Sequence, residues 1–384
     1  MQRRQFVTQA LAASTALAAP AFVRNALAQE GGISGKTLSI GCSAALTGPL
    51  GGFGQDVKQG AEAALAQINA RGGVHGRTLQ FQLVDDAYVP QRTTDNVKQM
   101  IGQGSAFALL SCVGTANNSA ILPLVEETGI PYVAPFTGAS SLRKGARNVF
   151  HVRASYSDEV RRLAQRLAMM GLKGIGVVYL DNPYGREMLE EAARALGEQN
   201  VQPSVQAALA TDGKNLNEVL AQVAQARPTA VLLATAGAAS VGLVRGLKKE
   251  MPGLLMAGVS ATLTSEGIQQ LGEAGSGLAL TLVMPDPHRA RSALVRDYQT
   301  AMRAKGRENF TLGSLEAYVN TRVLAEGLER AGADPTRAKL RTALASIRNW
   351  DLGGFVVDYS GQSPYAGSRY VDMGVLTGTG RFRG

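Results

Sequence analysis

A glycine-rich loop, SAALTGPLGGFG, occupies residues 43–54 directly after the apolar segment TLSIGC. Such a loop after a strand is a common phosphate-binding site, because exposed backbone N–H groups can surround the anion. This loop lacks the GK[ST] ending of a phosphate-binding loop. Gln55 and Asp56 follow Gly54, and the next lysine after the loop is Lys58. It also lacks the GxGxxG pattern and flanks of a dinucleotide-binding turn. We therefore expect no nucleotide and no other cofactor.

Side chains that bind metals or perform catalysis in other proteins are present but are not grouped. His75, His151 and His288 are the only histidines, and none pairs with another or with a cysteine at metal-ligand spacing. The chain contains no GxSxG elbow, and Ser111 and Ser119 have no recognisable base partner. The sequence therefore predicts no metal site, no catalytic residues and no enzymatic activity.

Adjacent carboxylates occur at a strand end and within two helical stretches. Neighbouring side chains on a helix point about 100° apart, so such pairs are expected to form solvated faces rather than acid–base partners. The pairs are Asp85-Asp86, Glu126-Glu127 and Glu190-Glu191.

Cys42 and Cys112 are the only cysteines, and both end apolar runs, TLSIGC and AFALLSC. An oxidising compartment permits a disulfide between them. Burial as two free thiols is at least as good an interpretation. A catalytic thiol is the poorest one, because no histidine or asparagine is placed to activate it.

Residues 1–28 have the features of an export signal of the twin-arginine type. Arg3 and Arg4 precede a weakly apolar stretch of alanines and leucines, and the small residues Ala26 and Ala28 suit signal peptidase. A plain Sec signal is the alternative. The apolar stretch is interrupted and falls short of the roughly 20 residues of a spanning helix. We expect cleavage near Ala28 and a soluble periplasmic protein.

The net charge of the 384-residue chain is +9, and removal of residues 1–28 takes away three arginines and no acid, which leaves +6. The basic residues are scattered as singles and pairs such as Lys248-Lys249, without a stripe interleaved with aromatics. We therefore expect no nucleic-acid partner. A mild positive field favours the arrival of anionic solutes. At about 100 to 200 residues per domain, the length predicts two domains.

From Lys36 onward, short apolar runs alternate with stretches of helical period, a pattern typical of parallel sheets with crossover helices. The class is therefore α/β, with two wound series of similar size. The predicted strands span residues 37–43, 79–86, 107–112 and 130–135 in the first series, and 174–180, 201–207, 229–235, 254–259 and 277–283 in the second.

The pattern changes after residue 284, where three helical segments follow without a strand and two β-like runs close the chain. We expect the chain to cross between the lobes more than once, which makes a hinge with a ligand cleft between the lobes. The predicted division is residues 36–153 plus 285–353 for lobe 1, and 154–284 plus 354–384 for lobe 2.

The predicted strand ends, which form the ligand crevice in open α/β sheets, carry small, hydroxylic and aromatic residues. Such residues can bind a ligand without reacting with it. Backbone N–H groups near helix N-termini bind a carboxylate, and aromatic rings pack against the apolar part of the ligand. The segments are Thr115-Ala116-Asn117-Asn118, Phe136-Thr137-Gly138-Ala139-Ser140, Asp181-Asn182-Pro183-Tyr184-Gly185 and Ala236-Gly237.

From about Lys36 to its end, the chain resembles the periplasmic solute-binding proteins of branched-chain amino acid ABC transporters. The resemblance implies a type I periplasmic binding fold: two doubly wound parallel-sheet lobes joined by a multi-crossover hinge. It also implies an ABC permease as partner, and we expect a monomer. The order and spacing of several motifs carry it: LTGPLGGFG with GAEAALAQINARGGVHGRTLQF, then ETGIPYVAPFTGAS, NVFHVR, DNPYG and GGFVVD.

The resemblance also implies which residues contact the ligand. The aromatic of the first loop falls on Phe53, the carboxylate-binding hydroxyl and amides on Thr115 and Ala116, and the second lobe's tyrosine on Tyr184. The backbone of Phe136, Thr137 and Gly138 is expected to complete the first lobe's half. Near the first crossing, Tyr156 is expected to face the cleft, and Arg153 to be a structural hinge residue.

Two positions depart from the amino-acid binders. The tyrosine that helps to hold the ligand's ammonium falls on Ala236, and the acid that pairs with it falls near Val259-Ser260, where no acid occurs. A buried ammonium without a counter-charge is costly. We therefore expect Ala236 and Ser260 to face a carboxylate ligand without an α-amino group, such as an aromatic or other apolar acid. Glu266 is the candidate for the missing acid if the correspondence is shifted.

The leading hypothesis is capture of a small carboxylate-bearing solute and its delivery to a permease by lobe closure. One alternative is transport of a branched-chain or other amino acid. Another is a sensor that presents its ligand to a membrane receptor.

Overall fold

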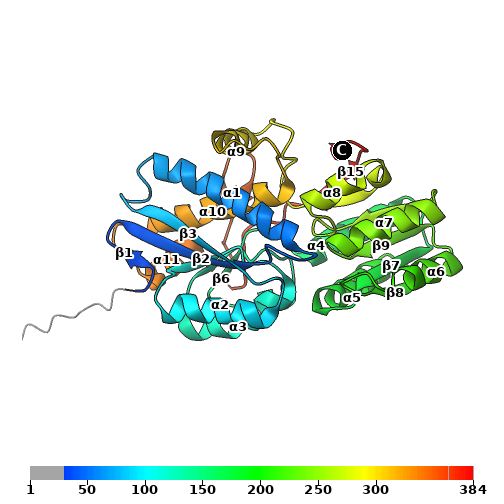
Figure 1. Cartoon of the computed structure of the whole chain (residues 1–384), viewed down its shortest axis with the longest axis horizontal. Coiled ribbons are helices and arrows are strands. Elements are labelled where there is room, and N and C mark those ends of the chain that lie inside the picture. The colour runs from blue at the N-terminus through cyan, green and yellow to red at the C-terminus, as the bar shows by residue number, and fades with distance from the viewer. Residues whose placement is uncertain (1–29, 362, 384) are drawn as a thin grey trace, which may run out of the picture.

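The computed structural model describes residues 30–361 and 363–383, and the predicted export signal at 1–28 lies outside them. The described chain forms two lobes, each built on a seven-stranded, mostly parallel sheet with helices packed against it (Figure 1). The predicted α/β class with two parallel-sheet lobes is confirmed.

The first sheet is built around the buried run TLSIGCSA, which forms β2 and pairs in parallel with β3 on one side and β4 on the other. Strands β5, β6 and β14 continue the sheet in parallel, and β1 pairs antiparallel with β2. Strands buried on both faces are near-continuous apolar runs, so they are recognisable in the sequence. Their bounds are β1 Ile33–Ser34, β2 Thr37–Ala44, β3 Thr78–Asp85, β4 Ala108–Leu110, β5 Tyr132–Val133, β6 Val149–His151 and β14 Tyr365–Ala366.

The helices of the first lobe pack in pairs, α1 on α10 and α2 on α3. The glycine-rich loop leads directly into α1, which begins at Gly51. Helices α9, α10 and α11 follow one another without a strand between them, as predicted. The bounds are α1 Gly51–Ala70, α2 Pro90–Gly102, α3 Thr115–Thr128, α9 Ala293–Ala304, α10 Leu312–Ala331 and α11 Arg337–Ala345.

The second sheet has the order β16-β15-β11-β10-β9-β7-β8, with β7 to β11 parallel and β15 and β16 antiparallel. Helix α8 was not predicted, because its seven residues are too few to show a helical period. The bounds are β7 Ile175–Leu180, β8 Gln206–Leu209, β9 Ala230–Ala234, β10 Leu255–Gly258, β11 Ala279–Leu282, β15 Asp372–Leu376, β16 Phe382–Arg383, α4 Tyr156–Met169, α5 Pro183–Gly197, α6 Leu216–Ala226, α7 Ala238–Glu250 and α8 Ser265–Leu271.

Within the described residues, the chain passes between the lobes between β6 and α4, between β11 and α9, and between β14 and β15. Several crossings of this kind form a hinge, because each connecting segment must adjust when the lobes move. No helix in the described part of the chain is both long and apolar enough to cross a membrane.

The last part of the chain differs from the expected domain division. All of residues 354–384 were expected in lobe 2, but β14 joins β6 in the first sheet, and only β15 and β16 join the second. The first-lobe core also buries Tyr359 and stacks the ring of Phe150 on that of Tyr365, with centroids 4.6 Å apart. An apolar alternation predicts a strand but not its neighbour, so it could not assign this segment to a sheet.

Cys42 and Cys112 are both fully buried, as free thiols, in the first lobe. The Cys42 thiol donates to the backbone oxygen of Ser111 at 3.5 Å, and Sγ of Cys112 accepts from the amide of Ser43 at 3.4 Å. Of the two interpretations left open by the sequence, the structure has the free thiols.

Candidate functional site

A cavity of about 430 Å3 lies between the two lobes. Segments that follow strand ends in both sheets form its wall: those after β2, β3, β4 and β5 in the first lobe, and after β7, β9 and β10 in the second. This is where the ligand crevice of an open α/β sheet is expected. The volume falls within the roughly 300–1,000 Å3 typical of small-molecule sites.

Most of the predicted ligand-contacting residues come together in this wall. The predicted residues that line the cavity are Phe53, Thr115, Phe136, Tyr156, Tyr184, Ala236 and Ser260. Ala116, Thr137 and Gly138 are not lining residues but lie directly beside ones that are. Glu266, the alternative acid, is exposed on α8 and is not a lining residue. Their contact with a ligand stays a prediction.

The N-terminus of α3 opens into the cavity at Gly114 and Thr115. The N-cap residue Gly114 offers no side-chain cap, and the amide of Thr115 donates to the Tyr88 hydroxyl, so of these two amides that of Ala116 remains available to an anion. Beside them, the hydroxyls of Thr115 and Thr137 are 2.9 Å apart. This arrangement can bind one carboxylate through the Ala116 amide and a hydroxyl.

The backbone amides at residues 136–138, which were expected to complete that carboxylate site, already have hydrogen-bond partners within the protein. The amide of Phe136 donates to the oxygen of Cys112 at 2.9 Å, and the amide of Thr137 donates to the oxygen of Pro135 at 2.8 Å. The amide of Gly138 donates to the side-chain oxygen of Tyr156. A ligand contact from this stretch of backbone stays a prediction.

Aromatic rings wall the space next to the α3 terminus. Phe53 lies 6.4 Å from Phe136 between centroids, and Tyr156 and Tyr184 form an edge-to-face pair at 5.4 Å. Ring faces and edges at these separations suit an apolar or aromatic ligand body.

Tyr88 also lines the cavity, and sequence reasoning missed it. Its φ of +62° is unusual for a residue with a side chain, and its amide donates to Oδ1 of buried Asp86 at 2.9 Å. Its ring lies so close to Gly114 that a Cβ at that glycine would be 2.2 Å from it. The only sequence signal near Tyr88 was the Asp85-Asp86 pair before it, which we interpreted as a solvated face.

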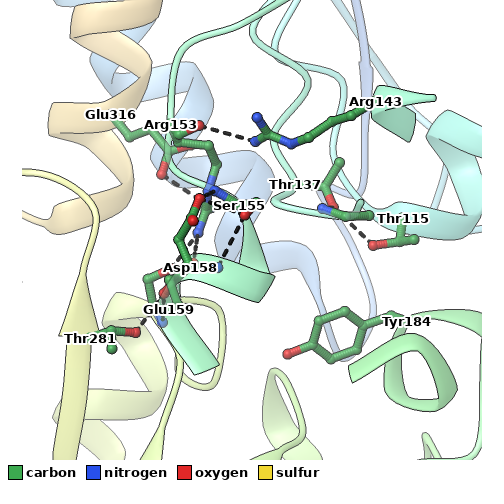
Figure 2. A network of polar contacts seen from close by, with 12 residues as sticks. Thr115, Thr137, Arg143, Arg153, Ser155, Asp158, Glu159, Tyr184, Thr281 and Glu316 are labelled. Carbon is green, nitrogen blue, oxygen red and sulfur yellow. Dashed lines mark hydrogen bonds and ion pairs between the residues drawn. The ribbon is translucent and has the colours of Figure 1, made fainter. Parts of the chain in front are cut away.

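Buried charges form the floor of the cavity, with Arg153 between acids of both lobes (Figure 2). Its Nη2 is 2.7 Å from Oε1 of Glu159 on α4, and its Nη1 is 3.4 Å from Oε2 of Glu316 on α10. It also contacts the hydroxyl of Ser260 and lies 5.2 Å from the ring centroid of Tyr156. Burial alone lowers the pKa of Arg153, but Glu316 and Glu159 more than reverse this, so it stays charged.

Two buried acids of the first lobe that no motif indicated, Asp56 and Glu316, reach the cavity. Oδ1 of Asp56 accepts from the hydroxyls of Thr311 and Ser265, both at 2.9 Å. Burial raises the pKa of Asp56 to about 6 against these hydrogen bonds, and it raises that of Glu316 to about 7 against the pull of Arg153. Isolated acids in helices give no sequence signal; only the fold brings them to the cleft.

Direct contacts close the cleft from one lobe to the other. The Glu187 carboxylate on α5 accepts from the amide of Ser140 at 2.5 Å and from the hydroxyl of Ser141 at 2.6 Å. The amide of Ala238 donates to the oxygen of Pro49 at 3.1 Å. A Cβ atom at Gly237 would lie 2.6 Å from the backbone oxygen of Pro49, so the close approach of these two segments requires glycine at position 237. The lobes are therefore in a closed arrangement.

The fold has two wound lobes, several crossings between them and a cleft at the strand ends. Residues 37–364 match the family model of the periplasmic binding proteins. The chain belongs to this family. Periplasmic binding proteins bind solutes and are not enzymes. The expected type I fold and the likeness to the branched-chain amino acid group are confirmed.

Individual periplasmic binding proteins show how far the similarity extends. The Leu/Ile/Val-binding protein homolog 3 of Brucella melitensis is 26% identical over 312 residues, which are 80% of this chain and 83% of that protein. A substrate-binding periplasmic protein from Ralstonia solanacearum is 29% identical, with a TM-score of 0.84 over 90% of this chain and 99% of its own. A solute-binding protein of an R. palustris ABC transporter, solved with benzoate, shares the fold at 19% identity and a TM-score of 0.80, over 90% of this chain and 95% of its own.

Proposed function

We propose that this protein captures a small solute with a carboxylate group and delivers it to an ABC permease by closure of its lobes. The observation that carries this proposal is the uncapped N-terminus of α3 in the cavity wall, next to the Thr115–Thr137 hydroxyl pair. Aligned N–H groups and a hydroxyl stabilise an anion without any covalent step.

We further propose an aromatic or other apolar acid as the ligand. The rings beside the α3 terminus offer an apolar surface, and neither Ala236 nor Ser260 can pair with an α-ammonium. The Ser260 amide and hydroxyl are already bonded to Glu159 and Arg153. The benzoate complex of the R. palustris neighbour agrees with such a ligand, whereas the Leu/Ile/Val-binding relative makes an amino acid the alternative.

Lobe closure would distinguish the ligand-bound protein from the ligand-free one. Both lobes contribute to the cavity wall, so a bound solute adds contacts only when the lobes are together. The binding free energy therefore favours the closed state over the open one. A permease that recognises both lobe surfaces at once would then accept the loaded form.

A thermal-shift screen tests the ligand class, because a ligand that binds the folded protein raises its melting temperature by mass action. The panel contains amino acids and aromatic, aliphatic and dicarboxylic acids, followed by calorimetric titration of the best compounds. We expect apolar acids to stabilise the protein. Micromolar binding of leucine, with no heat of binding in titrations of aromatic acids, would contradict the proposal.

The Thr115→Val variant tests the carboxylate site. It removes one hydrogen bond to a charged group, worth about 1.5–3 kcal/mol, so affinity for the acid should fall about 10- to 100-fold. The matched control is Thr128→Val at the other end of α3, where the hydroxyl bonds to the oxygen of Leu124 at 2.7 Å. Equal affinity of both variants would remove Thr115 from the site.

A further inference from the structure

Glu316 is the least satisfied acid in the cavity wall. Its side chain is buried on α10, with 4% of the residue exposed, and Oε1 has no hydrogen-bond partner among the described residues. Its Oε2 makes only the 3.4 Å contact with Nη1 of Arg153. Buried polar atoms are nearly always hydrogen-bonded, so an unpaired oxygen in the wall of a binding cavity is expected to meet a group of the ligand.

Arg153 is bound more closely to the other acid. Its Nη2 is 2.7 Å from Oε1 of Glu159. Oε2 of Glu159 accepts from the amide of Ser260 at 2.8 Å and from the hydroxyl of Thr281 at 2.5 Å. Both oxygens of Glu159 are therefore hydrogen-bonded, whereas Oε1 of Glu316 has no partner among the described residues.

The charges that face Glu316 do not favour an added anion. They are Arg153 from the first crossing, Glu159 from α4 and Asp56 from α1, so one cation faces three carboxylates when Glu316 is counted. An incoming carboxylate would meet this excess of negative charge if Glu316 stayed ionised. Like charges in a buried site favour protonation of one of them. The other charged or titratable residues in the cavity wall, besides its tyrosines, are His288, Glu308 and Arg381.

We propose that Glu316 is a specificity-determining residue that binds an anionic ligand in its neutral form, with its carboxyl O–H donating to an acceptor atom of the ligand. Where Glu316 is ionised before binding, it then takes up one proton from solvent for each anion captured. This inference rests on the proposed function, that is, on a ligand without an ammonium group. A zwitterion would instead place a cation near Glu316 and keep it ionised.

The pKa of Glu316 in the ligand-free protein also agrees with this role. Burial raises the pKa of Glu316, Arg153 lowers it and Glu159 raises it, and the net value is about 7. Near neutral pH the residue is thus poised between its two forms, and a nearby ligand anion shifts it to the neutral one. Anion affinity is therefore expected to be flat below about pH 6 and to fall by up to about tenfold per pH unit above 7.

Calorimetric titration of the wild-type protein measures the proton directly. The probes are benzoate, hexanoate and L-leucine, each titrated at pH 7.5 in phosphate and in Tris, whose ionisation enthalpies differ. With a pKa of about 7, roughly three-quarters of Glu316 is ionised at pH 7.5, so uptake of about that fraction of a proton per bound acid supports the proposal. Binding of an acid with the same heat in both buffers would overturn it, and so would tighter acid binding at pH 8 than at pH 6.

The Glu316→Gln variant tests which residue takes up the proton, since the amide keeps the shape and a donor but cannot titrate. It should bind the acid at pH 8 more tightly than wild type does, with no pH slope above about pH 7, where Asp56 is already ionised. Glu326→Gln, a partly buried residue of the same helix that pairs with Arg330 and does not line the cavity, is the matched control and should keep the wild-type slope. A wild-type slope in Glu316→Gln would refute the assignment. The buffer comparison needs no variant, so it decides even if Glu316→Gln fails to fold.

The outcomes separate this inference from the function on which it rests. Acid binding without proton uptake refutes only the role of Glu316. Binding of L-leucine alone, or of none of the probes at any pH, refutes the proposed acid ligand and the inference with it.

Discussion

The Glu187 carboxylate of the second lobe accepts a hydrogen bond from the Ser141 hydroxyl of the first at 2.6 Å. The amides of Ser140 and Ser141 donate to the same carboxylate, at 2.5 and 3.2 Å. These bonds lie across the cleft and outside the cavity wall. They can exist only while the lobes are together, so they stabilise the closed state without touching a ligand.

Replacing Glu187 with alanine should weaken ligand binding by about tenfold. The loss of charge-assisted hydrogen bonds makes closure less favourable, and closure contributes to the measured affinity. Calorimetric titration checks the affinity, and small-angle scattering with saturating ligand checks the closed fraction. The control is Glu190→Ala on the same helix, which is exposed. If both variants bind alike, the contact does not contribute to closure.

The Phe53→Ala variant should bind the ligand about tenfold more weakly and melt at nearly the wild-type temperature. Phe53 is half-buried at the start of α1 and offers its ring to the cavity, so the ligand loses apolar contact while the lobe core is left intact. Thermal unfolding of the empty protein and titration with the acid measure the two effects separately. Unchanged affinity would exclude the ring from the site.

Asp56 should make the stability of the empty protein depend on pH. Its pKa is about 6 in the folded protein, raised by burial from an ordinary value near 3.8. The folded state therefore holds a proton that the unfolded chain has already released, and the associated stability is present below about pH 4 and lost as pH rises through 6. A shift of about two pKa units corresponds to a free energy on the order of 3 kcal/mol.

The Asp56→Asn variant isolates this effect. Its melting temperature relative to wild type should rise by several degrees between pH 4 and pH 8, because the amide cannot ionise. Glu218→Gln, an exposed position on α6, should show no such trend. A pH-independent difference between Asp56→Asn and wild type would show that Asp56 is not titrating in this range.

Cys42 and Cys112 should be unreactive toward Ellman's reagent in the native protein and react fully in denaturant. Both are fully buried, so the reagent cannot reach either sulfur, although the hydrogen bond with Cys42 lowers the pKa of the Cys112 thiol while burial raises that of Cys42. Intact-mass measurement of protein purified under oxidising conditions gives a second readout. A mass two hydrogens lower would mean that the two sulfurs pair in solution.

The secondary structure was predictable where local pattern and burial agree. TLSIGC, GIGVVYL and TAVLLAT are apolar runs buried on both faces, and they form β2, β7 and β9. The cleft residues at strand ends, such as Thr115 and Tyr184, followed from the topology of open sheets together with the family resemblance. The short strand β12 (Trp350–Asp351) and the helix α8 gave no usable period, and the sheet joined by Tyr365 could not be predicted from its own residues.

The charged part of the site was not predictable. Asp56 and Glu316 are 260 positions apart, and each is a single acid in an ordinary helical stretch. Their common place in the cavity depends on the packing of α1 on α10. Tyr88 depends on a left-handed backbone and on the space left by Gly114, neither of which has a pattern of its own.

The sequence by itself determined the α/β class, the two lobes and the position of the cleft, because periodicity, glycine-bounded turns and strand ends are local features. The tertiary structure decided which charges face the ligand and which contacts close the lobes. Those depend on side chains from distant segments meeting in a buried, weakly solvated space, where a few ångströms decide whether an acid is paired, as Glu159 is, or left unpaired, as Glu316 is.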